Sequence, residues 1–386
     1  MTTPASSHDS HFPPDASWDG AADRQSRVRI SDPGALISSV PALLGFHPHR
    51  SLVAICLSGT RVGAVMRHDL VLGGGADGRV MDLVLEQFAA VAAREEADRM
   101  LAVMVDDRIP VRARDADLEP YAGVAARLRD ALGRSAIALA AVHVCRRIET
   151  GAAWQDLTGT SRGTVPDPTA SQVAAAQVIG GRAIRGSREE LEAVIEPAPL
   201  REQARVAALV DRAREDGLRE PTRSCAVADP LRADRVSLEG VLAEIARFES
   251  DDEPPSPHEC ARLALALEIP RVRDSLLALA AGSHAGAAEQ LWIHLARVLP
   301  DPERAEPLSL LGYSAYVRGD GPMAGVALYA ALAADPCHRL ANLLDDALQA
   351  GLRPDLLRDL AVIGHQVAEE IGVQLPPLDP LSTGGV

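Results

Sequence analysis

Apolar residues recur along the first half of the chain with two periods, one typical of strands and one typical of helices. Five apolar or β-branched runs have strand length: RVRI, SLVAICLS, RVGAVMRHDLVL, MLAVMV and IALAAVHVC. Amphipathic stretches lie between them, and residues 77–96 carry one helical stripe of apolar positions: Val80, Leu83, Val84, Phe88 and Val91. Strands that alternate with helices predict an α/β domain, which we expect over residues 27–198.

Two of the predicted strands are too close together for a helical crossover. Only Gly59 and Thr60 separate the run at 51–58 from the run at 61–72, which predicts a β-hairpin. A hairpin pairs its strands antiparallel, whereas the longer connections suit parallel strands. We therefore expect a mixed sheet, whose strand order the sequence leaves open.

In the second half of the chain the apolar pattern is helical. Residues 199–235 are charged and predict a helical linker, and residues 236–374 predict a helical domain. The stretch LSLLGYSAYVRGDGPMAGVALYAALAADP, within residues 305–338, fits one tetratricopeptide-like unit without a gap. Such a unit needs neighbouring helices to bury its core, which the flanking stretches near 285–298 and 337–350 supply. The sequence does not decide between a closed bundle and an open solenoid.

Composition and charge narrow the chemistry. All 39 basic residues are arginine, so there is no lysine for a Schiff base or for a phosphate-binding loop ending in Gly-Lys-Ser/Thr. The formal net charge is −15, and most of it lies in the second half. An acidic chain argues against nucleic acid as a partner, because phosphates need a basic face.

We expect neither a membrane partner nor export. No apolar run approaches the roughly 18 residues that cross a membrane. Residues 1–26 have neither the basic start nor the apolar core of a secretion signal, and they predict a disordered tail, as do residues 375–386. The five cysteines are odd in number and nowhere spaced C-x-x-C, which predicts reduced thiols and a cytoplasmic location.

Two short motifs resemble catalytic or cofactor signatures. Residues 73–78 match the G-x-G-x-x-G dinucleotide fingerprint, but the run before them is predicted to pair in a hairpin. Residues 159–163 match the G-x-S-x-G nucleophile elbow, yet TGT precedes the serine of this match and prolines follow it, so the strand and helix of an elbow are missing. We expect neither motif to carry chemistry.

Histidine and cysteine pairs occur twice, as His143 with Cys145 and as His258 with Cys260. Two ligands do not make a zinc site, which needs three or four. We therefore expect no metal and no cofactor, and we expect these side chains to be structural.

The stretch HPHRS, residues 47–51, gathers ionisable side chains before an apolar strand. Ligands in open α/β sheets bind beyond the carboxyl ends of strands, and the two aspartates after MLAVMV mark such an end. A histidine there moves protons and an arginine binds an anion. The candidate ligand pocket is His47, His49, Arg50, Ser51, Asp106 and Asp107.

The competing interpretation of HPHRS is a helix-to-strand turn, in which Pro48 holds His47 extended. HPHRS precedes its strand, so it lies opposite the ligand edge unless the neighbouring strand runs antiparallel. This geometry favours the turn, and both interpretations stay open.

Three segments together resemble a known family: LLGFHPHRSLVAI, GTVPDPTASQVAAAQVIGGRAIRGSREEL and LGYSAYVRGDGPMAGVALYAALAADPCHRLANLL. In this order, over nearly all of residues 28–360, they resemble the actinobacterial domain of unknown function family 4192. The resemblance implies a cytoplasmic bacterial protein and a variable loop at residues 73–78. The family has no assigned activity, so the resemblance implies no catalytic residue. HPHRSLV and SREEL look like its hallmarks.

The favoured hypothesis is a non-enzymatic binding or scaffold protein, with an α/β domain, a tetratricopeptide-like helical domain and a protein as partner. The first helices of such repeats line a concave face. The aligned unit places a candidate partner groove there: Glu306, Ser309, Tyr313 and Tyr316. Tyrosines suit an interface, although both are equally suited to packing on the next helix. The alternative hypothesis is a small-molecule binder or enzyme that uses the α/β pocket.

Overall fold

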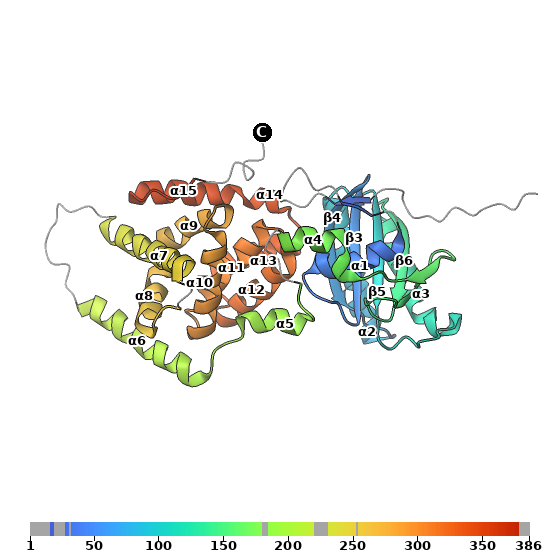
Figure 1. Ribbon diagram of the computed structural model, residues 1–386, viewed down its shortest axis with the longest axis horizontal. Helices are drawn as coiled ribbons and strands as arrows, with labels where there is room; N and C mark the ends of the chain where they lie inside the picture. Colours follow the sequence, from blue (N-terminus) through green and yellow to red (C-terminus); the bar gives the residue numbers. More distant parts are fainter. Residues whose placement is uncertain are drawn as a thin grey trace, which may run out of the picture. The chain divides into compact units, whose positions relative to one another are not determined.

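The computed structural model describes residues 16–18, 28–30, 32–179, 184–219, 231–251 and 254–377 (Figure 1). The chain divides into two compact units, Met1–Arg188 and Glu189–Val386. The first unit is built on a mixed β-sheet and the second consists of helices, as predicted. Apart from residues 16–18 and 375–377, the predicted tails lie outside the described residues.

The unit boundary lies earlier than the predicted end of the α/β domain at residue 198. The segment before Pro199 belongs to the helical unit, since the backbone N–H of Ala198 donates to the carbonyl of Arg297 at 2.7 Å. The predicted linker begins with a long helix whose Val206 and Val210 are buried against the helical unit. Residues 220–230 of that linker lie outside the described part of the chain.

The sheet has eight strands in the order β2-β1-β4-β3-β5-β6-β7-β8. Their bounds are β1 Ala16–Trp18, β2 Val28–Ile30, β3 Ser51–Ser58, β4 Arg61–Asp69, β5 Arg99–Val105, β6 Ala138–Cys145, β7 Ala153–Asp156 and β8 Arg162–Thr164. The pairs β1–β4 and β5–β6 are parallel and the others antiparallel. All five predicted strands are present, whereas β1, β7 and β8 were not predicted.

β3 is the centre of this arrangement, because it runs antiparallel to both β4 and β5. The predicted hairpin between β3 and β4 is confirmed, and Gly59 occupies the left-handed region in its turn with φ of 61°. The amino end of β3 therefore lies beside the carboxyl ends of its two neighbours.

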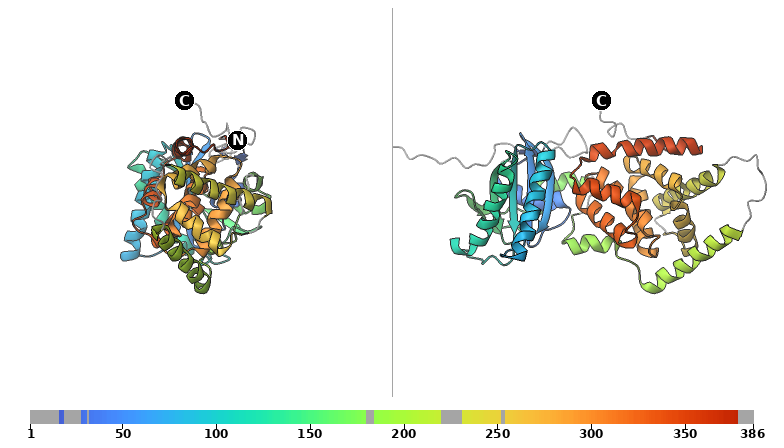
Figure 2. Two further views of the ribbon diagram at one scale, coloured as in Figure 1. Left: turned by 90° about the vertical axis from the view of Figure 1, so that its left-hand side faces the viewer. Right: turned by 180° about the vertical axis from the view of Figure 1, so that it is seen from behind.

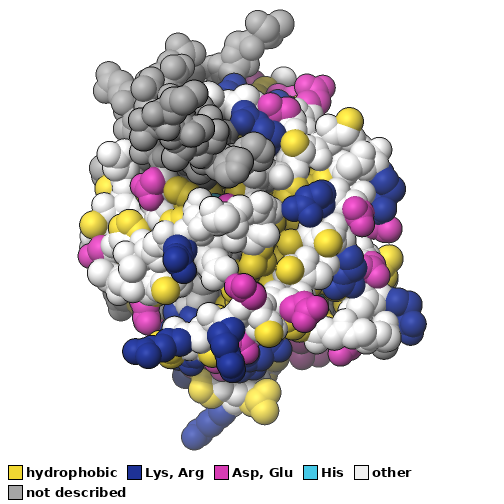
Figure 3. All heavy atoms as spheres, turned by 90° about the vertical axis from the view of Figure 1, so that its right-hand side faces the viewer, with side chains coloured by type: hydrophobic (Ala, Val, Ile, Leu, Met, Phe, Trp, Pro, Cys, Tyr) yellow, Lys and Arg dark blue, Asp and Glu magenta, His cyan; other side chains and the backbone are white. Residues whose placement is uncertain are grey.

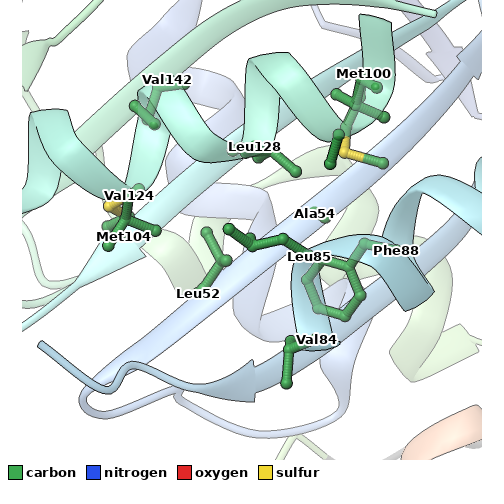
Figure 4. Close-up of a cluster of buried hydrophobic side chains, with 14 of the residues drawn as sticks. Leu52, Ala54, Val84, Leu85, Phe88, Met100, Met104, Val124, Leu128 and Val142 are labelled. Atoms are coloured by element: carbon green, nitrogen blue, oxygen red, sulfur yellow. The ribbon is translucent and has the colours of Figure 1, made fainter. Parts of the chain in front are cut away.

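Two helices, α2 (Ala76–Arg94) and α3 (Asp115–Gly133), cover one face of the sheet (Figures 1 and 2). They cross over from β4 to β5 and from β5 to β6. Figure 4 shows their apolar side chains packed against strand residues of this face, including Leu52, Ala54, Met100, Met104 and Val142. Burial of this shared apolar surface stabilises the layer of helices on the sheet.

The buried stripe of α2 differs from the predicted one. Val80 and Leu83 are exposed, at 49% and 67%, whereas Met81 and Leu85 are buried. The helix packs on both the sheet and α3, so two neighbours determine which of its side chains are buried. The buried stripe is therefore shifted by about one residue toward the C-terminus from the predicted stripe.

The opposite face of the sheet is covered by α1 (Pro33–Leu44), with α4 (Gln172–Ile179) packed against α1 (Figures 1 and 2). Asp32 caps α1 by accepting a hydrogen bond from the backbone N–H of Ala35 at 3.0 Å, and Pro33 follows at the first helical position. The sheet is thus buried on both faces at its centre, which leaves its edges to present polar groups.

The second unit is a packed array of helices. Their bounds are α5 Arg188–Glu192, α6 Leu200–Arg219, α7 Arg232–Asp251, α8 Pro257–Leu267, α9 Pro270–Leu276, α10 Ala285–Val298, α11 Ala305–Val317, α12 Gly321–Ala334, α13 Arg339–Gln349, α14 Pro354–Leu357 and α15 Asp359–Ile371, with 3₁₀ turns η2 Ala193–Ile195 and η3 Leu277–Ala281. α5 begins at the last residue of the first unit.

α11 is the central helix of the second unit, and 12 of its 13 residues are buried. It contacts α10, α12, α13, α14 and η3, and Figure 1 shows α10, α12 and α13 beside it. α11 and α12 form the hairpin predicted for the repeat-like segment, turning at Gly319 with φ of 80°. Gly312 lets the two helices approach, because a Cβ there would lie 2.8 Å from the Leu328 side chain. The helices of this unit pack around α11.

The surface carries mixed charge. On the face shown in Figure 3, arginine and acidic side chains are interspersed, with apolar side chains between them. None of the helices in the described ranges combines the length and the hydrophobicity that a membrane crossing requires.

The contact of α15 with α9 and η3 depends on Gly364. A Cβ at this position would lie 2.6 Å from the Asp274 carbonyl oxygen and 2.9 Å from the Ala278 nitrogen. We expect Gly364→Ala to lower the free energy of unfolding by about 1–3 kcal/mol, measured by urea denaturation, because backbone atoms must move apart.

Gly123→Ala is the matched control. Gly123 lies inside α3 with nothing within 4 Å of its Cβ position, so the substitution is expected to stabilise by about 0.5–1 kcal/mol. Equal effects of the two substitutions would contradict the close approach at Gly364.

Candidate functional site

The antiparallel setting of β3 brings HPHRS to the carboxyl end of β5. Ser51, the first residue of β3, pairs with Val105, the last residue of β5, and with Asp69, the last residue of β4. HPHRS was expected at the ligand edge of the sheet only if a strand beside β3 runs antiparallel to it. β5 does so, and HPHRS therefore lies at this edge. The residues after β5 become neighbours of Arg50.

Arg50, His49 and Asp107 form one exposed charged group at this edge. The Arg50 Nε donates to Asp107 Oδ1 at 2.7 Å and its Nη2 donates to Oδ2 at 3.4 Å, while His49 Nε2 lies 3.4 Å from Oδ2. The hydrogen bond from Arg50 holds the pKa of Asp107 at about 2. Asp107 is thus a carboxylate at neutral pH, and it fixes the position of the Arg50 side chain.

Asp106 is fully buried and its hydrogen-bonding capacity is used internally. It accepts bonds from the backbone N–H of Arg108 at 2.9 Å, from Arg108 Nη2 at 2.6 Å and from the Tyr121 hydroxyl at 2.9 Å. Burial raises the pKa of Asp106, but the bonds from Arg108 and Tyr121 outweigh it, so the pKa lies below its ordinary value. Asp106 acts as the anchor of Arg108.

Ser51 is also engaged. Its hydroxyl donates to the carbonyl of His49 at 2.7 Å and accepts from Arg67 Nε at 2.9 Å. Arg67 is itself paired with Asp69 and lies 5.9 Å from the centre of the Phe46 ring. Ser51 is buried and serves to join the turn before β3 to β4.

His47 lies apart from the other predicted pocket residues. Its backbone N–H donates to the carbonyl of Arg185 at 3.0 Å, beside the bridge between Phe46 and Arg185. Within the described residues, no hydrogen bond or ion pair joins the His47 ring to Asp106 or Asp107. The predicted pocket therefore separates into an exposed group around Asp107 and a buried one around Asp106.

Arg146 completes the edge, although the sequence did not single it out. It follows β6, which runs parallel to β5, and its Nη1 donates to the carbonyl of Ile109 at 2.7 Å. The backbone N–H of Asp106 donates to the carbonyl of Cys145 at 3.0 Å, which holds the two strand ends together. The sequence signal was available: Arg146 comes directly after a predicted strand.

The two short motifs lie where strands end or turn. Residues 73–75 lie in the loop that follows β4, the second strand of the hairpin, and residues 76–78 begin α2. The G-x-S-x-G match at 159–163 lies in the antiparallel turn between β7 and β8, not between a strand and a helix. The G-x-S-x-G match therefore lacks the strand and helix of its motif, and the G-x-G-x-x-G match follows a hairpin strand that β3 separates from β5.

The cysteines near histidine are buried thiols. Burial raises the pKa of Cys56, Cys145 and Cys260 to about 12 in each case, so these groups are protonated at neutral pH. The Cys260 sulfur lies 3.7 Å from Nε2 of His294, a histidine of α10. Across the described ranges, no group of three or more His, Cys, Asp or Glu side chains is arranged to hold a metal ion.

The residues predicted to form a partner groove lie in the interior of the bundle. The hydroxyls of Tyr313 and Tyr316 donate to the carbonyls of Leu357 at 2.9 Å and Leu352 at 2.8 Å, and both rings are buried. Ser309 is buried and bonds to the carbonyl of Glu306. The two tyrosines are thus buried inside the helical unit, as in the alternative that the sequence left open, although their hydroxyls bond to the segment around α14 and not to the next helix.

Glu306 faces two basic groups of the bundle. Its carboxylate lies 3.6 Å from Arg273 Nη1 and 3.2 Å from His338 Nε2. The Nδ1 of His338 accepts the backbone N–H of Ala341 at 3.1 Å, so this histidine caps α13. Glu306 joins α9, α11 and α13 inside the bundle.

A groove of about 350 Å³ opens elsewhere on the helical unit. Residues at i, i+3, i+4 and i+7 place one face of α10 along it: Gln290, Ile293, His294 and Arg297. The rest of its lining is Val298 at the end of α10, Ala198 and Pro199 just before α6, Glu202 of α6 and Phe248 of α7. The sequence alone does not reveal this groove, because its lining comes from stretches far apart in the chain.

The walls of this groove are fixed by internal bonds. The Arg297 Nε donates to the carbonyl of Glu196 at 3.3 Å, and the Gln203 amide donates to the carbonyl of Ala198 at 2.7 Å. The His294 ring lies 6.4 Å from the Phe248 ring, and burial lowers the pKa of His294. His294 is therefore neutral at pH 7, while Glu202 and Arg297 bring opposite charges to the rim.

We expect Asp106→Asn to lower the free energy of unfolding by about 2–4 kcal/mol, because the amide cannot accept every bond and Arg108 loses its counter-charge. Urea denaturation measures the change. Asp130→Asn on the exposed side of α3 is the control, expected to stay within about 0.5 kcal/mol. Equal small effects would contradict an anchoring role for Asp106.

The Arg50–Asp107 pair predicts a specific pH dependence. The pKa of Asp107 is lower in the folded chain than its ordinary value, so the pair stabilises the fold above the ordinary pKa and this contribution fades as the pH falls. We expect Asp107→Asn to be less stable than the wild type near neutral pH, with a difference that shrinks as the pH falls below the ordinary pKa of an aspartate and is lost only below about pH 2. A stability difference that persists unchanged on acidification would contradict the pairing.

A family model described as Domain of unknown function (DUF4192) matches residues 33–355, which include most of both units. No curated protein and no solved structure matches the chain. The family match confirms the family resemblance found in the three sequence segments. The chain belongs to the DUF4192 family, a domain of unknown function.

Proposed function

We propose that this chain is a non-enzymatic binding protein whose helical unit takes up an extended segment of a protein partner. The observation that carries the proposal is the groove of about 350 Å³ beside α10. We propose this groove in place of the partner surface expected from the repeat alignment, because Tyr313 and Tyr316 of that surface are buried. A concave, partly apolar site with a few placed polar groups is the usual form of a binding site.

The floor of the groove suits an apolar side chain. Ile293 and Phe248 are half-buried there, and Val298 is buried beneath. Covering one leucine-sized side chain contributes about 1.5–3 kcal/mol. Leu200, which is 83% exposed on the first turn of α6, adds apolar surface next to Pro199.

The rim of the groove suits a peptide backbone or charged end. Glu202 and Arg297 are exposed and of opposite sign, and Gln290 offers both a donor and an acceptor. Groups of both signs around an apolar floor favour a zwitterionic or mixed-charge peptide over a uniformly charged polymer.

The state of the reactive groups supports binding rather than catalysis. The thiols of Cys56, Cys145 and Cys260 are buried and protonated, so they are not nucleophiles. The Asp106 carboxylate and the Ser51 hydroxyl are both occupied by internal hydrogen bonds. The buried carboxylate and hydroxyl of the sheet edge thus have structural tasks.

Two further expectations belong to this proposal. The thiols of the described cysteines are free, which supports a reducing, cytoplasmic location. The α11–α12 hairpin with its close contact at Gly312 supports a tetratricopeptide-like origin for this part of the bundle.

Peptide-display selection against the full chain, followed by calorimetry with a selected peptide, tests the groove. We expect Ile293→Gln to raise the Kd of that peptide at least about tenfold, because it places a polar group on the apolar floor. Val236→Gln is the control: it makes the same change on an exposed position of α7, roughly 18 Å along the helix from Phe248. No enrichment of peptides, or equal affinity for all three chains, would overturn the proposal.

A further inference from the structure

Three arginines from three different strand ends converge on one four-residue turn of the first unit. The turn, Asp106–Ile109, is closed by a hydrogen bond from the Ile109 N–H to the Asp106 carbonyl at 3.2 Å. Arg50 contacts it through Asp107, Arg108 is part of it, and Arg146 contacts it through the Ile109 carbonyl. We call this arrangement the edge turn.

The strand register explains the convergence. Ser51 of β3 and Cys145 of β6 pair with Val105 of β5 from opposite sides. Arg50, just before β3, and Arg146, just after β6, therefore lie on either side of the edge turn. Neighbouring strands lie about 4.8 Å apart, which puts these two backbones within about 10 Å of each other. An arginine side chain spans much of that distance.

Each of the three guanidinium groups is held on one side and open on another. Arg50 is tied to Asp107, Arg108 to Asp106 and to the Leu70 carbonyl at 3.2 Å, and Arg146 to the Ile109 carbonyl. In the part of the chain that the structure describes, Nη1 of Arg50 and of Arg108 makes no hydrogen bond. The same holds for Nε and Nη2 of Arg146.

Open donors on tethered arginines are what an anion site requires. The side chains of Arg50 and Arg108 are 51% and 43% exposed, so their open donors are reachable from solvent. Because the chain already fixes each guanidinium, binding an anion costs little side-chain entropy. Surface arginines without such tethers would lose more freedom on binding.

The local charge is also suitable. Three guanidinium groups meet two carboxylates at the edge turn, which leaves one positive charge in excess on a chain of net charge −15. Both carboxylates are already paired, so they repel an incoming anion less than free aspartates would. His49, 3.4 Å from Asp107, adds a further positive charge when it is protonated.

Backbone strain marks the same place. Arg50 has φ of 43°, in the left-handed region that costs a residue with a side chain about 1–2 kcal/mol. Its carbonyl accepts the Leu70 N–H at 2.6 Å, which holds this conformation. Strain of this kind is retained where the surrounding structure requires one side-chain position.

We propose that the edge turn binds the phosphate group of a small molecule through Arg50, Arg108 and Arg146. A tetrahedral anion presents oxygens in several directions, which matches donors that arrive from three strands, and the planar guanidinium fork suits phosphate geometry. The edge turn also lies beyond the carboxyl ends of β5 and β6, where ligands of open α/β sheets bind. This site lies in the first unit and is independent of the groove in the helical unit.

Calorimetry of the full chain with inorganic phosphate and with a nucleoside monophosphate tests the site, with ionic strength held constant by chloride. We expect at least one probe to bind with a Kd of about 1 mM or tighter, detectable at about 10 mM ligand. Tighter binding of the nucleotide would indicate a ligand with a body beyond the phosphate. Equal affinities would indicate recognition of the phosphate alone.

Variants distinguish phosphate binding at the edge turn from non-specific electrostatic attraction of the anion to the chain. We expect Arg50→Gln and Arg146→Gln each to raise the Kd roughly tenfold, since each removes charge-assisted hydrogen bonds. Arg134→Gln is the control, because it removes the same charge after α3, near the amino end of β6, and its expected Kd is that of the wild type. Circular dichroism confirms that each variant is folded.

Arg146→Lys keeps the charge and removes the fork, so it distinguishes geometry from charge. A Kd raised as in Arg146→Gln supports recognition by the tethered guanidinium. The proposal is overturned if neither probe binds at about 10 mM, or if Arg50→Gln and Arg146→Gln bind as tightly as Arg134→Gln.

Discussion

β3 runs antiparallel to both of its neighbours, and the chemistry of the first unit depends on this one setting. Its backbone hydrogen bonds fix Ser51 opposite Val105 and Asp69, so the turn before β3 must lie at the carboxyl ends of β4 and β5. A parallel β3 would carry HPHRS to the far edge, away from the aspartates. The pairing of Arg50 with Asp107, the anchoring of Ser51 and the edge turn all follow from the strand direction.

The polar groups of the first unit lie at the ends of the strands because helices cover both faces of the sheet. α1, α2 and α3 cover the centre of the sheet, and the charged groups gather where the strands end. A buried carboxylate such as Asp106 is tolerated only with partners, which Arg108 and Tyr121 supply. The helical unit follows the same rule: the hydroxyls of its buried tyrosines bond to backbone carbonyls.

Five of the eight strands, the hairpin and the division into α/β and helical parts were predictable, because period, length and the turn at Gly59 are local signals. The contact of Arg50 with Asp107 spans 57 residues and depends on strand order, which no local pattern encodes. Tyr316 was open to two interpretations, since a helix with apolar residues on every side has no preferred face until its neighbours are known. The groove beside α10 needed the fold for the same reason.

Methyl–methyl nuclear Overhauser contacts in a deuterated, methyl-labelled chain test the direction of β3 most directly. The antiparallel register predicts contacts of Val53 with Val103 and of Ile55 with Leu101. A parallel β3 that kept the first contact would instead place Ile55 beside Val105. Observing Ile55 with Leu101 supports the edge turn, whereas Ile55 with Val105 would move Arg50 to the opposite edge and contradict the account.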